Sequence, residues 1–139
     1  MCIRDRPVPV YSISITSYGS IAYGFVDLNT ASSTVGGDTQ TVQNDGSLSE
    51  KLNIRSSNAI GGTSWLLAGT ASNDQYTHEF STTTGSVWKS MPDSSTYVSA
   101  SNAVLPSGTV DFDFRLRVPT GTTDFAEKSI TITVQAVAP

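Results

Sequence analysis

The stretch that decides the fold is VDFDFRLRVP, residues 110–119. Apolar residues alternate with charged ones, so an extended chain presents two different faces. The apolar face carries Val110, Phe112, Phe114, Leu116 and Val118, and the other carries Asp111, Asp113, Arg115 and Arg117. Opposite charges four residues apart on one strand are ~13 Å from each other, too far to pair. We therefore interpret the charges as a solvent-facing surface; the alternative is a carboxylate pair for metal or acid–base chemistry.

The same alternation recurs along the chain, for example in YSISITSY (11–18), DQYTHEFS (74–81) and KSITITVQAVA (128–138). Clusters of Gly, Pro, Asn, Asp and Ser separate these runs, as turns do. Eight or nine short strands of this kind predict an all-β fold, an antiparallel two-sheet sandwich of the Ig-like or jelly-roll-like type. We expect one such domain over residues 7–139.

Three local expectations follow from the pattern. Asn44-Asp45-Gly46 predicts a hairpin turn, because Asn and Asp tolerate a positive φ and Gly favours it. In the run that follows, Leu48, Leu52 and Ile54 are expected inside, with Glu50, Asn53 and Arg55 turned mostly outward. The stretch SIAYGFVDLN (20–29) reads as a further strand interrupted at Gly24, and only STYVSASNAV (95–104) offers room for a helical turn.

Composition excludes several classes of function. Charged residues make up only 14% of the 139 residues, and the formal net charge is −4. A nucleic-acid partner needs a basic face, so we expect none. No apolar run approaches the ~20 residues of a membrane-spanning helix. Ser and Thr together supply 39 residues. A surface rich in hydroxyl groups and poor in charge is typical of extracellular β-domains.

Residues 1–6, MCIRDR, fit none of this pattern. They resemble a translated sequencing-adapter fragment, and we expect them to be a non-native remnant; a native N-terminal tail is the alternative. They hold the only cysteine, so the rest of the domain contains no disulfide partner. If the true N-terminus was replaced, we expect that a signal peptide or an anchor was lost with it. We expect an extracellular or cell-surface location.

Catalytic and metal motifs are weak. His78 is the only histidine, and HEFST (78–82) lacks the second histidine of a zincin helix. No G-x-S-x-G nucleophile elbow is present. We expect His78 to be a strand residue in an aromatic cluster, and the protein to be non-catalytic and without a cofactor. Calcium at the loop acids is an open alternative: Asp27, Asp38 and Asp93.

Aromatic residues in turn-rich segments suggest a second kind of function. Trp88 and Tyr97, with Tyr18 and Tyr23, could form a platform on which a sugar stacks. Packing in the core or at its rim is the alternative for these rings, and it is the reading we favour for Trp65 and Phe80. The candidate glycan-binding residues are Trp88 and Tyr97.

The segment VGGDTQTVQNDGSLSEKLNI (35–54) and the ending SITITVQA (129–136) resemble small secreted β-sandwich proteins of bacteria. These include the camelysin and TasA-like matrix-fibre family and bacterial Ig-like surface modules. Gly36 departs from the proline usual in the fibre family, and the proteolytic activity of camelysins does not carry over without a metal motif. The resemblance implies a structural or adhesive surface module that assembles through edge strands or an exchanged N-terminal strand. Its partners would be further copies, other surface proteins or a glycan.

Overall fold

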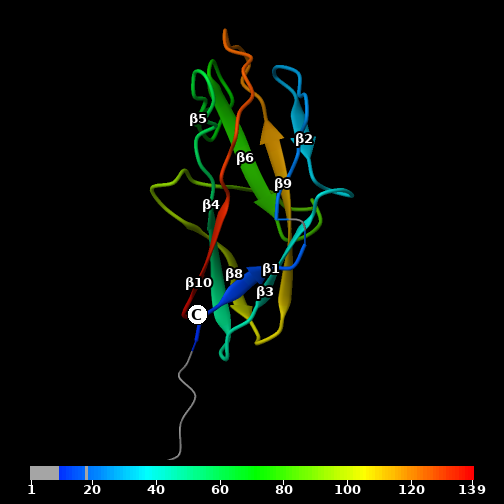
Figure 1. Ribbon diagram of the computed structural model, residues 1–139, viewed down its shortest axis with the longest axis vertical. Coiled ribbons are helices and arrows are strands. Elements are labelled where there is room, and N and C mark those ends of the chain that lie inside the picture. Colours follow the sequence, from blue (N-terminus) through cyan, green and yellow to red (C-terminus); the bar gives the residue numbers. More distant parts are fainter. Residues whose placement is uncertain (1–9, 18) are drawn as a thin grey trace, which may run out of the picture.

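The computed structural model describes residues 10–17 and 19–139. In these residues there is no helix, and the strands form two sheets (Figure 1). The all-β, two-sheet expectation is confirmed, with ten strands in place of eight or nine. They are β1 (Ile13–Ile15), β2 (Ala31–Ser33), β3 (Gln40–Asn44), β4 (Glu50–Arg55), β5 (Leu66–Leu67), β6 (Gln75–Ser81), β7 (Lys89–Ser90), β8 (Val98–Val104), β9 (Thr109–Arg117) and β10 (Thr133–Val137).

Strand β9, formed by the alternating stretch, is the centre of the larger sheet. The sheet has seven strands in the order β1-β3-β9-β6-β5, with β2 paired to β9 and β7 paired to β6. Along β9, β3 pairs with residues 109–112 and β2 with residues 115–117, while β6 pairs with residues 113–117. All these pairs are antiparallel except β5 with β6. β9, the longest of the described strands, thus pairs with β2, β3 and β6 of the larger sheet.

The smaller sheet has three antiparallel strands in the order β10-β4-β8. In its register Asn53 of β4 lies between Gln135 of β10 and Ser99 of β8. Residues 95–104, where the sequence offered room for a helical turn, therefore contain strand β8. This agrees with its β-branched and small residues, which suit a pleated surface better than a helix.

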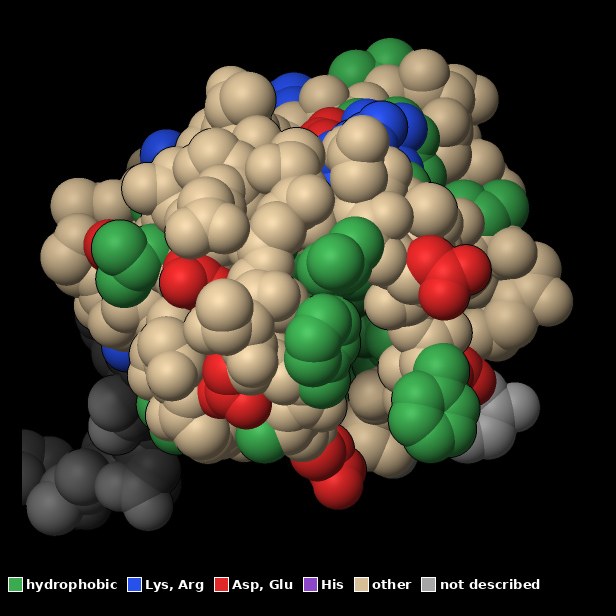
Figure 2. Space-filling view, turned by 90° about the horizontal axis from the view of Figure 1, so that it is seen from above, with side chains coloured by type: hydrophobic (Ala, Val, Ile, Leu, Met, Phe, Trp, Pro, Cys, Tyr) green, Lys and Arg blue, Asp and Glu red, His purple; other side chains and the backbone are tan. Residues whose placement is uncertain are grey.

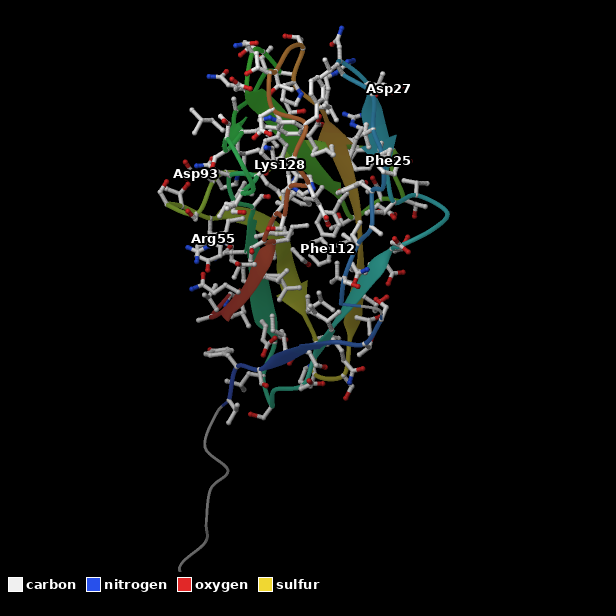
Figure 3. The ribbon with its side chains drawn as sticks, turned by 45° about the horizontal axis from the view of Figure 1, so that its top comes forward. Phe25, Asp27, Arg55, Asp93, Phe112 and Lys128 are labelled. Atoms are coloured by element: carbon white, nitrogen blue, oxygen red, sulfur yellow. The ribbon has the colours of Figure 1, made fainter. Side chains whose placement is uncertain are left out.

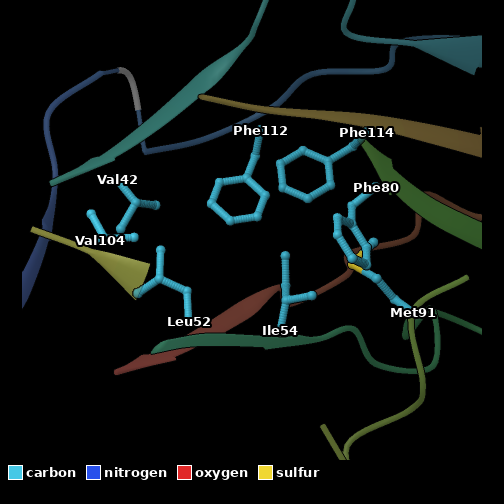
Figure 4. Packing of buried hydrophobic residues seen from close by; sticks show 8 residues of the cluster. All are labelled: Val42, Leu52, Ile54, Phe80, Met91, Val104, Phe112 and Phe114. Atoms are coloured by element: carbon cyan, nitrogen blue, oxygen red, sulfur yellow. The ribbon is translucent and has the colours of Figure 1, made fainter. Parts of the chain in front are cut away.

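The core lies between the two sheets (Figure 4). Phe112 and Phe114 of β9 are at most 2% exposed, and their rings stack with a centroid separation of 6.2 Å. Leu52 and Ile54 of β4 pack against them from the smaller sheet. The main cluster is completed by side chains from four further segments: Val42, Phe80, Met91 and Val104. A second cluster contains Ala59, Tyr76, Leu116 and Val118. The apolar side of the alternation is confirmed as the core side.

The turn at residues 44–46 is not a hairpin, which corrects the expectation. β3 belongs to the larger sheet and β4 to the smaller one, so the turn carries the chain from one sheet to the other. Asn44 organises it: its Nδ2 donates to the carbonyls of Leu48 and Val104, each at 2.8 Å, and its Oδ1 accepts from the Gly46 amide at 2.7 Å. Gly46 has no positive φ, but a Cβ there would collide with the Val10 carbonyl oxygen.

Two acids expected in solvent are buried. Glu50 is fully buried, because it shares the side of β4 that carries Leu52 and Ile54. Its Oε1 accepts from the Ser12 amide at 2.5 Å. Asp113 is 2% exposed, and its carboxylate accepts hydrogen bonds from Thr34 and Thr39 in the chain between β2 and β3. The interpretation of residues 111–117 as one solvated face is therefore wrong at Asp113.

Two further expectations also need correction. Residues 20–29 contain no strand, and Gly24 interrupts the extended backbone with a φ of 69°. Leu48, expected inside, is 40% exposed because the turn from β3 projects it away from the core. The proposed remnant, residues 1–6, and Tyr18 lie outside the described residues.

Candidate functional site

An apolar groove opens beside the core, and two irregular segments form its walls. Its volume is about 1620 Å³. The floor includes Phe112, Phe114 and Leu116 of β9. Residues 19–28 form one wall, and residues 125–130 form the other together with Ile132 and with Val134 of β10. In Figure 3, Phe25 and Lys128 lie on opposite sides of Phe112. A concave, mostly apolar site with few polar groups is the usual form of a ligand pocket.

Two phenylalanines at the groove are exposed. Phe25 is fully exposed and Phe125 is 75% exposed, and both line the groove. In the view from above, hydrophobic side chains gather near the middle of the visible face (Figure 2). Exposed apolar surface around a cavity costs free energy in water, so it marks a place where another molecule is expected to bind.

The polar centre of the groove is His78, on β6. It is 1% exposed, and its ring contacts the rings of Tyr23, Tyr76 and Phe114 with centroid separations of 5.9–6.0 Å. The prediction of a histidine in an aromatic cluster is confirmed. Its Nδ1 is 2.8 Å from Ser56 Oγ, and its Nε2 is 2.9 Å from Tyr23 Oη. Two hydroxyl groups thus hold the ring from both sides.

Burial controls the protonation of this group. It lowers the pKa of His78 to about 3, so the imidazole is neutral at physiological pH. Burial also raises the pKa values of Tyr23 and Tyr76 above the ordinary value. A base this weak does not activate a hydroxyl near neutral pH, and Ser56 beside it is 1% exposed. The arrangement is suited to hydrogen bonding rather than to proton transfer.

Lys128, which lines the groove, forms an ion pair with Asp124. Lys128 Nζ lies 2.8 Å from Asp124 Oδ2, also donates to the Gly61 carbonyl, and lies 5.2 Å from the centroid of the Trp65 ring. The hydrogen bond from Lys128 is the largest cause that lowers the pKa of Asp124 to about 2; the amides of Ala126 and Thr63 contribute as well. The ammonium group is therefore already partnered.

Trp88 and Tyr97, the candidate glycan residues, belong to opposite sheets. Trp88 precedes β7 of the larger sheet, and Tyr97 precedes β8 of the smaller one. The guanidinium carbon of Arg115 lies 4.6 Å from the Trp88 ring centroid, and that of Arg55 lies 4.4 Å from the Tyr97 ring centroid. Neither residue lines the groove. Sugar binding at these rings stays a prediction.

The other candidates separate as well. Tyr23 lines the groove and contacts His78, rather than joining Trp88 or Tyr97. Asp93 accepts hydrogen bonds from Ser95, which lower its pKa, and Asp38 accepts from the Ala22 amide at 3.4 Å. Within residues 10–17 and 19–139, no three His, Cys, Asp or Glu side chains gather to hold a metal ion. The same residues include no helix that could cross a membrane.

Sequence reasoning missed the groove, the serine that holds His78, and the exposed phenylalanine at the groove. Ser56 stands in a polar run, RSSN, where nothing distinguishes the serine that meets His78. Phe25 looked like one more strand residue. The glycine just before it, Gly24, was the signal in the sequence, because glycine adopts a positive φ readily; its φ in the structure is 69°.

Comparisons of the chain with protein-family models, curated proteins and solved structures found no match. The resemblance to secreted β-sandwich and matrix-fibre proteins therefore stays a prediction.

Proposed function

We propose that the protein is a non-catalytic structural module of the cell surface or extracellular matrix that associates through the edges of its smaller sheet. One observation carries this proposal: β8 and β10 each pair only with β4 among the described strands. Their outer edges therefore present backbone N–H and C=O groups that a strand of another copy can pair with.

The sequences of these strands support the same conclusion. β8 reads VSASNAV and β10 reads TVQAV, without a charged residue or a proline in either. Proteins that remain monomeric usually protect edge strands with lysine, proline or a bulge. The pairing of β8 with β4 has two register shifts, each with an extra residue in β8, whereas β10 pairs with β4 without a shift and is the less protected edge. The hydroxyl-rich, weakly charged composition fits an extracellular module.

The register of the smaller sheet provides a matched test. Ser99, Asn53 and Gln135 lie in one row, so a lysine can be placed on either edge strand or on the central strand. We expect Ser99→Lys and Gln135→Lys to reduce self-association, because an ammonium group at an edge must be desolvated when a second strand pairs there. Asn53→Lys adds the same charge to the same face and is expected to leave association unchanged. Sedimentation velocity and electron microscopy measure the assembly.

The proposal fails if the wild-type protein stays monomeric at high concentration. It also fails if Asn53→Lys reduces association as much as the two edge variants, because net charge rather than edge pairing would then control it. Thermal unfolding of all three variants shows whether each retains its fold.

A further inference from the structure

We propose that the groove is a binding site for a neutral, elongated apolar molecule that carries a hydroxyl group, with Tyr23 as its hydrogen-bonding partner. This activity is independent of the edge strands. The groove is lined by Phe112, Phe114 and Leu116 below and, at the sides, by residues 19–28 and by residues 125–130 with Ile132 and Val134. Its volume of about 1620 Å³ accommodates a molecule larger than a single side chain, and its apolar lining favours hydrocarbon.

Hydrogen-bond counting identifies the polar anchor. A phenol has one donor and two acceptor positions, and a neutral imidazole has one donor and one acceptor. Tyr23 Oη has one described partner, His78 Nε2. If Nε2 carries the proton, the phenol accepts one bond and keeps its own O–H free. If Nδ1 carries the proton, the phenol donates to Nε2 and keeps its lone pairs free. In both tautomers Tyr23 has unused hydrogen-bonding capacity.

The position of Tyr23 directs that capacity to the groove. Tyr23 lines the groove, whereas Ser56, on the other side of the imidazole, does not. Ser56 Oγ holds His78 at 2.8 Å, and its neighbour Tyr76 donates to the Ser57 carbonyl, so the inner part of the network is fixed by protein groups. A ligand hydroxyl both donates and accepts, so it can pair with Tyr23 in either tautomer.

Charge decides against an acidic ligand. Lys128 is the only cationic side chain in the described lining, and Asp124 and the Gly61 carbonyl already bind it. His78 is buried and neutral. Asp27 and Glu127 also line the groove and would repel a carboxylate. A fatty alcohol therefore fits this lining better than the fatty acid of the same length.

The experiment uses 1-octanol as the probe and octanoate at pH 7 as the matched acid. The protein has two tryptophans, so in a Trp88→Phe background the fluorescence reports only on Trp65, which lines the groove. We expect 1-octanol to change this fluorescence saturably and octanoate to bind at least tenfold more weakly. Tyr23→Phe is expected to weaken 1-octanol binding roughly fivefold to tenfold, the effect of one lost hydrogen bond. Tyr11→Phe, an exposed tyrosine outside the groove, is the control and is expected to bind like its background.

Absence of saturable 1-octanol binding overturns the proposal. Equal binding of octanoate overturns the argument from charge, and unchanged binding by Tyr23→Phe overturns the assignment of the anchor. The comparison of the two probes needs only the Trp88→Phe background, so it decides the question even if Tyr23→Phe does not fold. Binding of 1-octanol by a protein that stays monomeric would support this site while contradicting the proposed assembly.

Discussion

Buried polar residues connect segments that are distant in the sequence. Asp113 is buried on the outer face of β9, where its Oδ1 accepts from Thr34 Oγ1 at 3.0 Å and from Thr39 Oγ1 at 2.5 Å. The Thr34 amide also donates to the Phe114 carbonyl, and the Phe114 amide donates to Thr34 Oγ1, each at 2.9 Å. One carboxylate thus fastens the chain between β2 and β3 to the central strand.

Replacing this carboxylate is expected to destabilise the protein. Asp113→Ala leaves two hydroxyl groups without their acceptor in a buried position, which costs about 1–3 kcal/mol of unfolding free energy. The matched control is Asp111→Ala on the same strand: Asp111 is exposed and accepts only from Thr41 Oγ1 at 2.7 Å. Urea unfolding measures both. Equal small losses for the two variants would contradict the structural role of Asp113.

His78 sets the expected acid sensitivity. Its pKa is about 3 in the folded protein against an ordinary value of 6.5, so the unfolded chain binds the proton more readily. The stabilisation is complete above pH 6.5 and is lost as the pH falls toward 3, by about 1.4 kcal/mol per pH unit. We expect unfolding free energy to fall between pH 7 and pH 5, where the chain has no other histidine to titrate.

The matched variant for this prediction is His78→Gln, which keeps polar atoms at the site but does not titrate. It is expected to be less stable at pH 7 and to show a flatter dependence on pH between 7 and 5. The same slope in the wild type and in His78→Gln would show that other groups cause the acid sensitivity.

At the scale of elements, the connection between β3 and β4 decides how the two sheets are joined. Asn44 is 1% exposed, and its side chain binds Leu48, Val104 and Gly46 at once. Its backbone bonds Gly108 and Ser107, in the connection between β8 and β9. The β3–β4 connection and the β8–β9 connection, which both run between the two sheets, therefore meet at Asn44.

Removing this side chain is expected to weaken both crossings. Asn44→Ala leaves the buried Val104 carbonyl and the partly buried Leu48 carbonyl without their side-chain donor, and we expect a loss of about 2 kcal/mol of unfolding free energy. Asn102→Ala on β8 is the control, because Asn102 is exposed and its side chain meets only Ser99 Oγ, at 3.3 Å. Thermal unfolding compares the two, and a similar midpoint for both variants would contradict the role of Asn44.

The two sheets differ in their number of strands, and this difference shapes the whole molecule. Seven strands face three, so part of the larger sheet is covered by irregular chain instead of by a strand (Figure 1). The groove lies between the irregular segments 19–28 and 125–132. Among the described strands, the smaller sheet is open, so β8 and β10 are its two edge strands. Edge pairing and groove binding are thus separate consequences of one architecture, and their tests distinguish them.

The alternation of the chain by itself determined the fold class and most of the core. Phe112, Phe114, Leu52 and Ile54 are buried as the pattern predicts, because a strand with one wet face must turn alternate residues inward. The same local rule predicted His78 beside aromatic rings. The burial of alternate strand residues depends only on neighbours in the sequence, so it could be predicted; two of the rings that contact His78, those of Tyr23 and Phe114, come from distant segments.

Only the tertiary structure decided which strands pair and what covers them. Nothing near Asn44 in the sequence shows that β3 and β4 enter different sheets, since β1 and β9 take the places beside β3. Asp113 is buried where Thr34 and Thr39 of a distant segment donate to it, and the groove exists because two distant segments leave a space over β9. Such contacts join residues far apart in the chain, so no local periodicity encodes them.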